Sequence, residues 1–292
     1  MPKTLAAGIA AAALVLAATA CAPKDDTGSS GSSGSSSTTK TASCQAGDLP
    51  TKKSGTLTVG TDSPAYDPWF SDDDPTNGKG FESAVAYAVA KQLGFSKDEV
   101  RWITVPFNSS YAGGDKKFDF DINQISITPE RAEVVDFSDG YYSAAQAVIA
   151  LKGTDGAEAA SLDDLTGLRL GAQTGTTSLT AIRDIIQPET DPVVFEDTNG
   201  AKQALQNDQV DAILADLPTA FYISAVEIPK SVIVGQFQPE TGQQEEFGML
   251  FQKGSGLVPC VNQALAELRE DGTIADLEQQ WLSDVVDVPT LQ

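Results

Sequence analysis

The sequence predicts an α/β fold with mostly parallel sheets. Its 292 residues, 41% of them hydrophobic, suffice for one or two globular domains with real cores. From about Gly55 onward, short runs rich in β-branched residues alternate with segments of helical periodicity, which is the pattern of α/β proteins. No repeat of a solenoid kind interrupts this alternation.

The individual elements follow from hydrophobic spacing. Helical spacing begins at Phe81, and Gly94 stands where a helix C-cap belongs. The strands are expected at 56–60, 101–105, 145–151, 168–172, 211–215, 232–234 and 247–251. The helices are expected at 81–93, 179–186, 201–205, 261–268 and 274–281. In such folds ligands bind in crevices at the carboxyl ends of strands.

Charge and composition exclude several function classes. The 41 acidic and 19 basic residues give a net charge of -22, so a nucleic acid or an anionic lipid surface would repel the chain. There is no histidine, which removes Ser-His-Asp and Cys-His catalytic sets and histidine-based metal sites. The three cysteines are far apart, so neither a zinc site nor any other metal or cofactor site is expected.

The N-terminal sequence predicts an export signal followed by a flexible tether. Residues 1–20 carry a basic start and an apolar run that is too short for a comfortable membrane span, as in a signal peptide. Ala18-Thr19-Ala20 before Cys21 resembles a lipobox, which implies lipidation of Cys21; the same residues also fit ordinary A-x-A cleavage. Residues 21–54 include a Gly/Ser-rich stretch that behaves as a flexible coil and suits a tether.

The remaining cysteines suggest a disulfide. If Cys21 carries lipid, Cys44 and Cys260 form an even pair in an oxidising compartment. We therefore expect a Cys44–Cys260 bond that pins the start of the folded part to its C-terminal part. Two unpaired thiols are the alternative.

Four stretches, in order along the chain, resemble the extracellular solute-binding proteins for polar amino acids (family 3, with a periplasmic-binding-protein-like type II fold). They are 58–70 leading to 80–82, 125–131 followed by 135–142, 171–177 with 211–216, and 268–281. The resemblance implies two α/β lobes joined by two hinge strands, with lobe 1 at 55–143 plus 243–286 and lobe 2 at 144–242. It implies a monomer that closes over an amino acid and delivers it to the permease of an ABC importer at the outer face of the cell membrane.

The resemblance also assigns the anchors of an amino acid. Arg131 matches the carboxylate-binding arginine, and a guanidinium can grip a carboxylate through two parallel bonds. Thr176 and Thr177, at the start of a helix, would add amide donors. Asp216 matches the ammonium-binding aspartate, with Ser126 and the Gln124 carbonyl as companions; a helix N-cap before Leu217 is its alternative role.

The remaining predicted binding residues would contact the side chain of the ligand and so set the specificity. Tyr66 and Phe107 fall where the family places aromatic rings around the ligand, although Trp69 competes with Tyr66 for that role. Asp62 would accept bonds from an amide, amine or guanidinium and would repel an acidic side chain. It therefore favours glutamine, arginine or lysine. Asn123 and Gln173 are further contacts. Asn123-Gln124 departs from a usually small pair, and Asp121 has no assigned place.

Two other functions share this fold. Exported dehydratases that act on cyclohexadienyl substrates resemble these proteins, but no residue here shows the features of a general acid or base. A ligand-sensing domain usually continues into a membrane segment, and none follows Trp281 in the sequence. We expect a binding protein and no enzyme.

Overall fold

The computed structural model describes residues 44–238, 245–282 and 288–292. The predicted signal peptide at 1–20, the predicted lipidation site Cys21 and most of the predicted tether lie outside these described residues. None of the described helices combines the length and the apolar character that a membrane span needs.

The first sheet has the order β2-β1-β3-β12-β4. Every residue of its strand β1 is buried, and β1 runs parallel to β2 and β3, whereas β12 runs antiparallel to β3 and β4. Its strands are β1 (Leu57–Thr61), β2 (Val100–Thr104), β3 (Phe120–Asp121), β4 (Val135–Phe137) and β12 (Leu250–Gln252). The short helices of this part are η1 (Ser71–Asp73), η2 (Lys97–Glu99), α2 (Phe107–Ser110) and α3 (Pro129–Val134).

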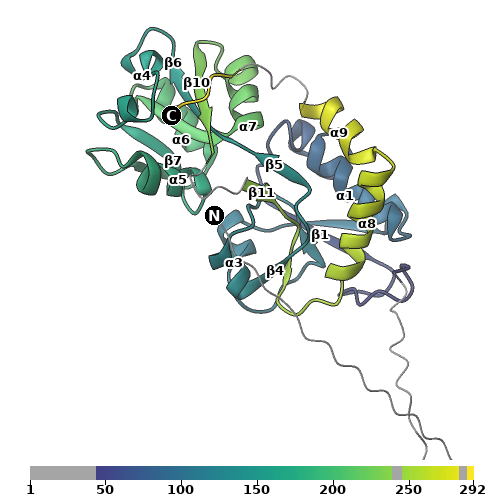
Figure 1. Ribbon diagram of the computed structural model, residues 1–292. Coiled ribbons are helices and arrows are strands. Elements are labelled where there is room, and N and C mark those ends of the chain that lie inside the picture. The colour runs from purple at the N-terminus through teal and green to yellow at the C-terminus, as the bar shows by residue number, and fades with distance from the viewer. Residues whose placement is uncertain (1–43, 239–244, 283–287) are drawn as a thin grey trace, which may run out of the picture. The chain divides into compact units, whose positions relative to one another are not determined.

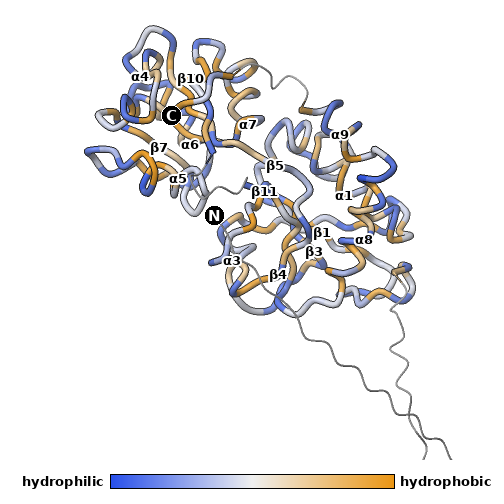
Figure 2. The backbone as a smooth tube through the Cα atoms, in the orientation of Figure 1, coloured by the Kyte–Doolittle hydropathy of each residue, from blue (hydrophilic) through white to orange (hydrophobic). Residues whose placement is uncertain are grey.

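Three longer helices pack against one another beside the first sheet (Figure 1): α1 (Phe81–Gln92), α8 (Val258–Glu270) and α9 (Thr273–Leu282). Gly94 follows α1 with φ +88°, and its N–H donates to the Lys91 carbonyl, so it ends this helix as predicted. Their apolar faces share one core with β1, and Figure 2 shows hydrophobic residues along the strands and hydrophilic residues in the outer loops.

The second sheet has the order β10-β6-β9-β7-β8. β7 runs parallel to β8 and β9, and β6 runs antiparallel to β9 and β10. Its strands are β6 (Gln146–Leu151), β7 (Leu170–Gln173), β8 (Val193–Phe195), β9 (Ala212–Asp216) and β10 (Ser231–Phe237). Its helices are α4 (Asp155–Glu158), η3 (Asp163–Leu165), α5 (Thr177–Ala181), η4 (Ile182–Ile186), α6 (Thr198–Gln206), α7 (Leu217–Tyr222) and η5 (Ile223–Glu227).

Two short strands that pair with each other in antiparallel fashion lie in the segments of the chain that connect the two sheets. β5 (Tyr142–Ala144) pairs with β11 (Glu245–Phe247), and each leads directly into a sheet strand, β6 and β12 respectively. Because β6 and β12 follow these connections, they run against their neighbours. Each five-stranded sheet is therefore mixed, with four strands that run in one direction and one reversed strand, β12 or β6. The expectation of mostly parallel sheets holds for the other strands, and these two reversals were not predicted, since hydrophobic spacing carries no information about strand direction. The strand expected at 247–251 is split into β11 and β12.

Trp69 belongs to the core of the first part of the fold. Its ring is fully buried and meets Phe81, Tyr142 and Phe247 edge-on, with ring centroids 5.4–6.1 Å away. Its indole N–H donates to Thr219 Oγ1 on α7 at 2.8 Å. The ring that lines the ligand pocket is accordingly Tyr66, and Trp69 is a packing residue.

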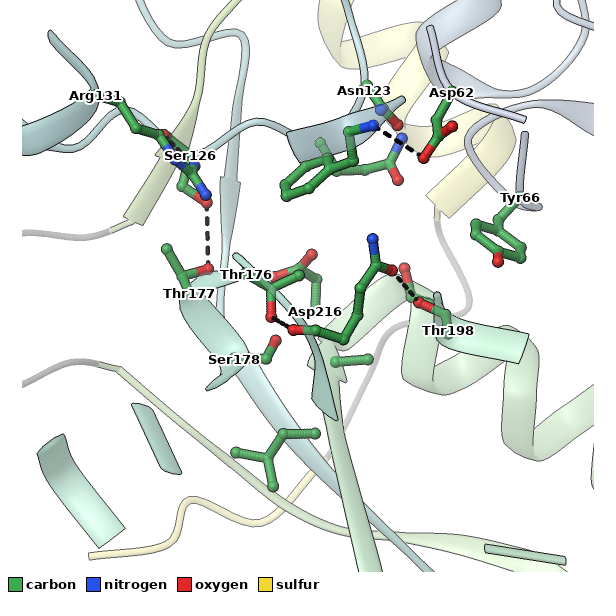
Figure 3. A pocket seen from close by; sticks show the side chains of 16 residues that line it. Asp62, Tyr66, Asn123, Ser126, Arg131, Thr176, Thr177, Ser178, Thr198 and Asp216 are labelled. Carbon is green, nitrogen blue, oxygen red and sulfur yellow. Dashed lines mark hydrogen bonds between the residues drawn. The ribbon is translucent and has the colours of Figure 1, made fainter. Parts of the chain in front are cut away.

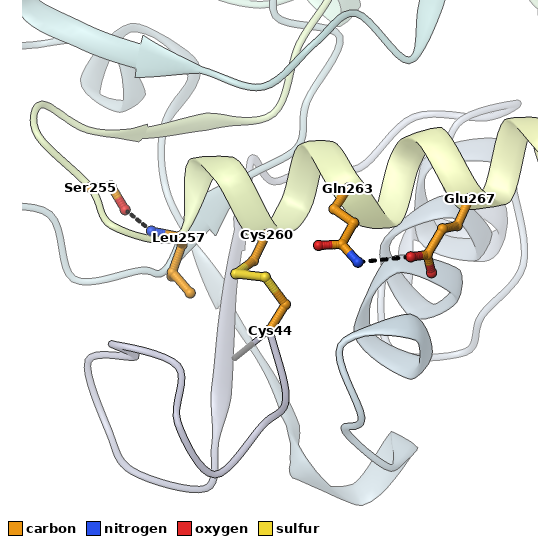
Figure 4. Close-up of a disulfide and its surroundings, with 6 residues drawn as sticks. All are labelled: Cys44, Ser255, Leu257, Cys260, Gln263 and Glu267. Carbon is orange, nitrogen blue, oxygen red and sulfur yellow. Dashed lines mark hydrogen bonds between the residues drawn. A yellow bond between two sulfur atoms is a disulfide. The ribbon is translucent and has the colours of Figure 1, made fainter. Parts of the chain in front are cut away.

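The Cys44 and Cys260 Sγ atoms lie 2.06 Å apart (Figure 4). Cys260 stands in the first turn of α8, and Cys44 is among the first residues that the structure describes. A disulfide between these two cysteines would attach the segment before β1 covalently to helix α8. Formation of this bond in the cell remains a prediction.

Candidate ligand-binding site

One pocket brings together all eleven residues that the sequence predicted as ligand contacts (Figure 3). They come from segments that are far apart in the chain, and several stand where strands end: Asp62 follows β1, Gln173 closes β7 and Asp216 closes β9. The pocket lining is Asp62, Tyr66, Phe107, Asn123, Gln124, Ser126, Arg131, Gln173, Thr176, Thr177, Ser178, Thr198, Leu214, Ala215, Asp216 and Thr219. The structure thus supports their proximity, and their roles toward a ligand remain predictions.

Arg131 is held rigidly at one end of the pocket. It stands in α3, whose N-cap Thr128 accepts a bond from the Arg131 amide. Its Nη1 donates to the Ser126 carbonyl at 2.7 Å, and its Nη2 donates to the Gly175 carbonyl at 2.9 Å. The guanidinium lies over the Tyr111 ring, 4.7 Å from its centroid.

These bonds fix the plane of the guanidinium and leave donors over, since arginine carries five N–H groups. Burial lowers the pKa of Arg131 below its ordinary value, and the nearby Glu245 and Asp216 act against that shift. Thr177 opens α5 beside it, and the Ser126 and Thr177 hydroxyl oxygens are 3.3 Å apart. This end of the pocket can receive a carboxylate.

Asp216 is held by a glutamine and faces a second acid. Gln146 Nε2 donates to Asp216 Oδ1 at 3.0 Å and to Glu245 Oε2 at 2.9 Å. Glu245 Oε1 also accepts a bond from the Ser126 hydroxyl at 2.5 Å. Although Asp216 occupies the N-cap position of α7, its side chain makes no capping bond, so the alternative role as a helix cap is not realised.

The electrostatics of this pair favour a cation. Burial raises the pKa of Asp216 well above its ordinary value, and the nearby Glu245 raises it further. Asp216 and Glu245 both accept hydrogen bonds from the Gln146 side-chain amide, and their carboxylate oxygens can accept more bonds than this amide supplies. A ligand ammonium would satisfy that capacity and relieve the repulsion.

The opposite side of the pocket carries mixed polar groups. The Asp62 carboxylate accepts bonds from the Ser63 amide at 2.7 Å and the Phe107 amide at 3.1 Å, and burial raises its pKa. Asn123 is only 7% exposed, and its Nδ2 has no hydrogen-bond partner in the described structure. Gln173 Oε1 accepts a bond from Thr198 at 2.9 Å. A buried, unsatisfied amide beside a pocket calls for an acceptor on the ligand.

Gln124 forms the floor of the pocket and is fixed by a buried acid. Its backbone has φ +48°, an uncommon value for a residue with a side chain. Its amide donates to Glu82 Oε1 at 2.6 Å, and its Nε2 donates to the other Glu82 oxygen. The Tyr141 hydroxyl also donates to Glu82, and burial raises the pKa of Glu82 to about 7. The Gln124 side chain therefore points to Glu82.

Asp121, which had no assigned place, is fully buried in β3. Neither of its carboxyl oxygens has a hydrogen-bond partner among the described residues. Burial, then Glu82, raises its pKa well above the ordinary value. A Cβ at Gly60 would lie 2.4 Å from Asp121 Oδ2, so the glycine makes room for this acid. Asp121 does not line the pocket.

Sequence reasoning missed the supporting residues Gln146, Glu245 and Glu82. Glu245 stands beside Glu246, and no periodicity tells which of the two faces inward. Gln146 opens a strand that is otherwise apolar, and this break in the pattern was the one available signal. The described residues contain no group of three or more metal-ligating side chains.

Residues 57–284 match the family of bacterial extracellular solute-binding proteins, family 3. The chain belongs to this family. Curated relatives include the L-cystine-binding protein TcyJ of Escherichia coli (strain K12), 31% identical over 79% of this chain and 84% of the relative. Another is the L-cystine-binding protein TcyA of Bacillus subtilis (strain 168), 32% identical over 80% of this chain and 84% of the relative. The fold is accordingly the two-lobed type II fold of periplasmic amino-acid-binding proteins.

Solved structures with this architecture agree with the family assignment. An ancestral arginine-binding protein bound to arginine is 33% identical, with a TM-score of 0.66 over 78% of this chain and 98% of that chain. An ancestral amino acid-binding protein described as a precursor of cyclohexadienyl dehydratase is 32% identical, with a TM-score of 0.65 over 78% of this chain and 95% of that chain. Both of these similar structures are thus described as amino-acid-binding proteins, and one of them is also described as the precursor of an enzyme.

Proposed function

We propose that this protein captures a polar or basic L-amino acid outside the cytoplasm and presents it to the permease of an ABC importer. One observation carries the proposal: Arg131 and Asp216 line one pocket, and Gln146 links Asp216 to a second acid, Glu245, so a cation and an acidic pair are arranged as the carboxylate and ammonium of an amino acid require. The relatives named for binding cystine, arginine and glutamine support the same class of ligand.

The ligand side chain would meet both an acceptor and a donor. Asp62 accepts hydrogen bonds, and Asn123 Nδ2 offers one, and Figure 3 shows both on the same side of the pocket. The side-chain amide of glutamine can satisfy both groups, whereas lysine and arginine can satisfy only Asp62. L-cystine is a second candidate, because its far half carries an ammonium and a carboxylate and two relatives are named for it.

The proposal also includes the location and architecture predicted above. Lobe 1 would comprise 55–143 plus 243–286 and lobe 2 would comprise 144–242, hinged at β5 and β11 and closing on the ligand. Cys21 would carry the lipid anchor after removal of residues 1–20. Mass spectrometry of the N-terminal peptide tests the anchor, and an unmodified peptide that begins elsewhere would contradict it.

A thermal-shift screen against the proteinogenic amino acids and L-cystine tests the function. A ligand that binds only the folded state raises the melting temperature by mass action. Arg131→Met should remove the shift while leaving the unliganded protein folded, because charge-assisted bonds of about 1.5–3 kcal/mol are lost. No shift with any amino acid, or an undiminished shift in the variant, would contradict the proposal.

A dehydratase is the alternative that the second solved structure keeps open. Incubation with arogenate or prephenate tests it directly, and turnover would establish an enzyme. Asp216 and Glu245 would serve no ammonium if the substrate were prephenate, which has none. The acidic pair therefore disfavours prephenate, whereas arogenate carries an ammonium, so the assay with arogenate is the one that separates an enzyme from a receptor.

A further inference from the structure

A second cavity continues the ligand pocket beyond Tyr66. It has a volume of about 200 Å³ and shares Tyr66, Thr198 and Thr219 with the ligand pocket as walls. One side is formed by the segment after β1 and the other by α6, α7 and η5. A ligand that reaches past Tyr66 would therefore enter this space.

The cavity contains a nearly buried cation. Lys202 on α6 is 8% exposed, which is unusual for a lysine. Its Nζ donates to Glu227 Oε1 at 2.6 Å and lies 5.2 Å from the centre of the Tyr66 ring. An ammonium has three donors, so Lys202 can accept a second anionic partner without giving up Glu227.

Acids face the same space from the segment after β1. Asp67 and Asp73 both line the cavity. Asp73 is already engaged, since its Oδ1 accepts a bond from the Ala65 amide at 2.6 Å. Asp67 is half-buried and is also engaged, by the Ser71 and Tyr222 side chains and the Asp72 backbone, and burial raises its pKa above the ordinary value. A carboxylate has about four acceptor sites, so Asp67 can still accept a bond from a ligand ammonium that enters the cavity.

We propose that this cavity is a second subsite, which receives the far end of an elongated amino acid that carries its own carboxylate and ammonium. Lys202 binds the far carboxylate and Asp67 binds the far ammonium, while Arg131 and Asp216 hold the near end. The proposal rests on the function proposed above and narrows its ligand class to diamino dicarboxylic acids. L-cystine is the probe, since each of its halves is a complete amino acid.

The alternative is that the Lys202–Glu227 ion pair only stabilises the packing of α6 against η5 and binds no ligand. Two substitutions separate that alternative from a ligand role. Lys202→Met removes the cation, whereas Glu227→Gln breaks the ion pair but keeps the cation in the cavity. A purely structural pair predicts the same result for both variants.

The experiment is calorimetric titration, in non-reducing buffer, of wild-type protein and both variants with L-cystine, S-methyl-L-cysteine and L-glutamine. S-methyl-L-cysteine keeps the near half of cystine and lacks the far charges. We expect wild-type protein to bind cystine more tightly than S-methyl-L-cysteine. Lys202→Met should weaken cystine at least tenfold, the loss of a charge-assisted bond, and leave the two shorter ligands within about twofold. Glu227→Gln should retain the affinity for cystine.

Asp67→Asn is a second, independent variant and should also weaken cystine selectively. Glutamine binding by each variant shows that the near site is folded. If the wild type binds glutamine but not cystine, the subsite proposal is contradicted. The proposed function as an amino-acid receptor would still stand. Equal losses for all three ligands, or matching losses in Lys202→Met and Glu227→Gln, would also overturn it. If no amino acid binds the wild type, the proposed function itself fails.

Discussion

At the scale of single residues, the pocket depends on groups that hold other groups in place. Arg131 is braced by two backbone carbonyls, and Gln124 is held in an uncommon backbone conformation by Glu82. Gln146 links Asp216 to Glu245. Side chains that are fixed before the ligand arrives lose little further freedom on binding, which preserves affinity.

Glu245 should set the pH dependence of ligand binding. Asp216 must be ionised to bind an ammonium, and its raised pKa means that it gives up a proton on binding; affinity should therefore rise with pH through that pKa. Glu245→Gln removes one cause of the raised pKa, so the affinity should reach its plateau at lower pH. Calorimetry between about pH 5 and pH 9 measures both profiles.

Glu246→Gln is the matched control for this experiment, because Glu246 is the exposed neighbour on the same strand and carries the same charge. The control should keep the wild-type profile. Identical shifts in the two variants would assign the effect to net charge and remove Glu245 from the site.

At the scale of elements, the sequence predicted the longer helices and the main strands in their order, missed short elements such as α2, α3 and β3, and said less about strand direction. Hydrophobic spacing located α1, α8, β1 and β9 to within a few residues, because each buries one face or a whole strand. The antiparallel course of β6 and β12 follows from the β5–β11 pair, whose strands are about a hundred residues apart. Local patterns do not encode such long-range pairing.

The Cys44–Cys260 bond should stabilise the layer of α1, α8 and α9. It would close a loop with a sequence separation of 216, and restricting the unfolded chain in this way contributes about 2–5 kcal/mol. The double variant Cys44→Ser/Cys260→Ser should lose that much in denaturant unfolding. Reductant should destabilise the wild type equally and leave the variant unchanged. Equal stabilities under all conditions would show that the thiols are unpaired.

At the scale of the whole molecule, the residues that line the pocket come from both sheets and from the connections between them. Arg131 on α3 bonds to Gly175 after β7, and Trp69 bonds to Thr219 on α7. The family resemblance predicted which residues meet here, since it supplied positions that are scattered along the chain. It did not supply Gln146, Glu245 or Lys202, whose partners depend on how the segments fold around the pocket.

We propose that the pocket holds a free amino acid by both its α-carboxylate and its α-ammonium. Calorimetric titration tests it most directly by comparing the tightest-binding L-amino acid with its α-amide and with its analogue that lacks the α-amino group. Both analogues should bind at least tenfold more weakly, because one leaves Arg131 without an anion and the other leaves Asp216 and Glu245 without a cation. Binding of either analogue with the affinity of the parent amino acid would contradict the account.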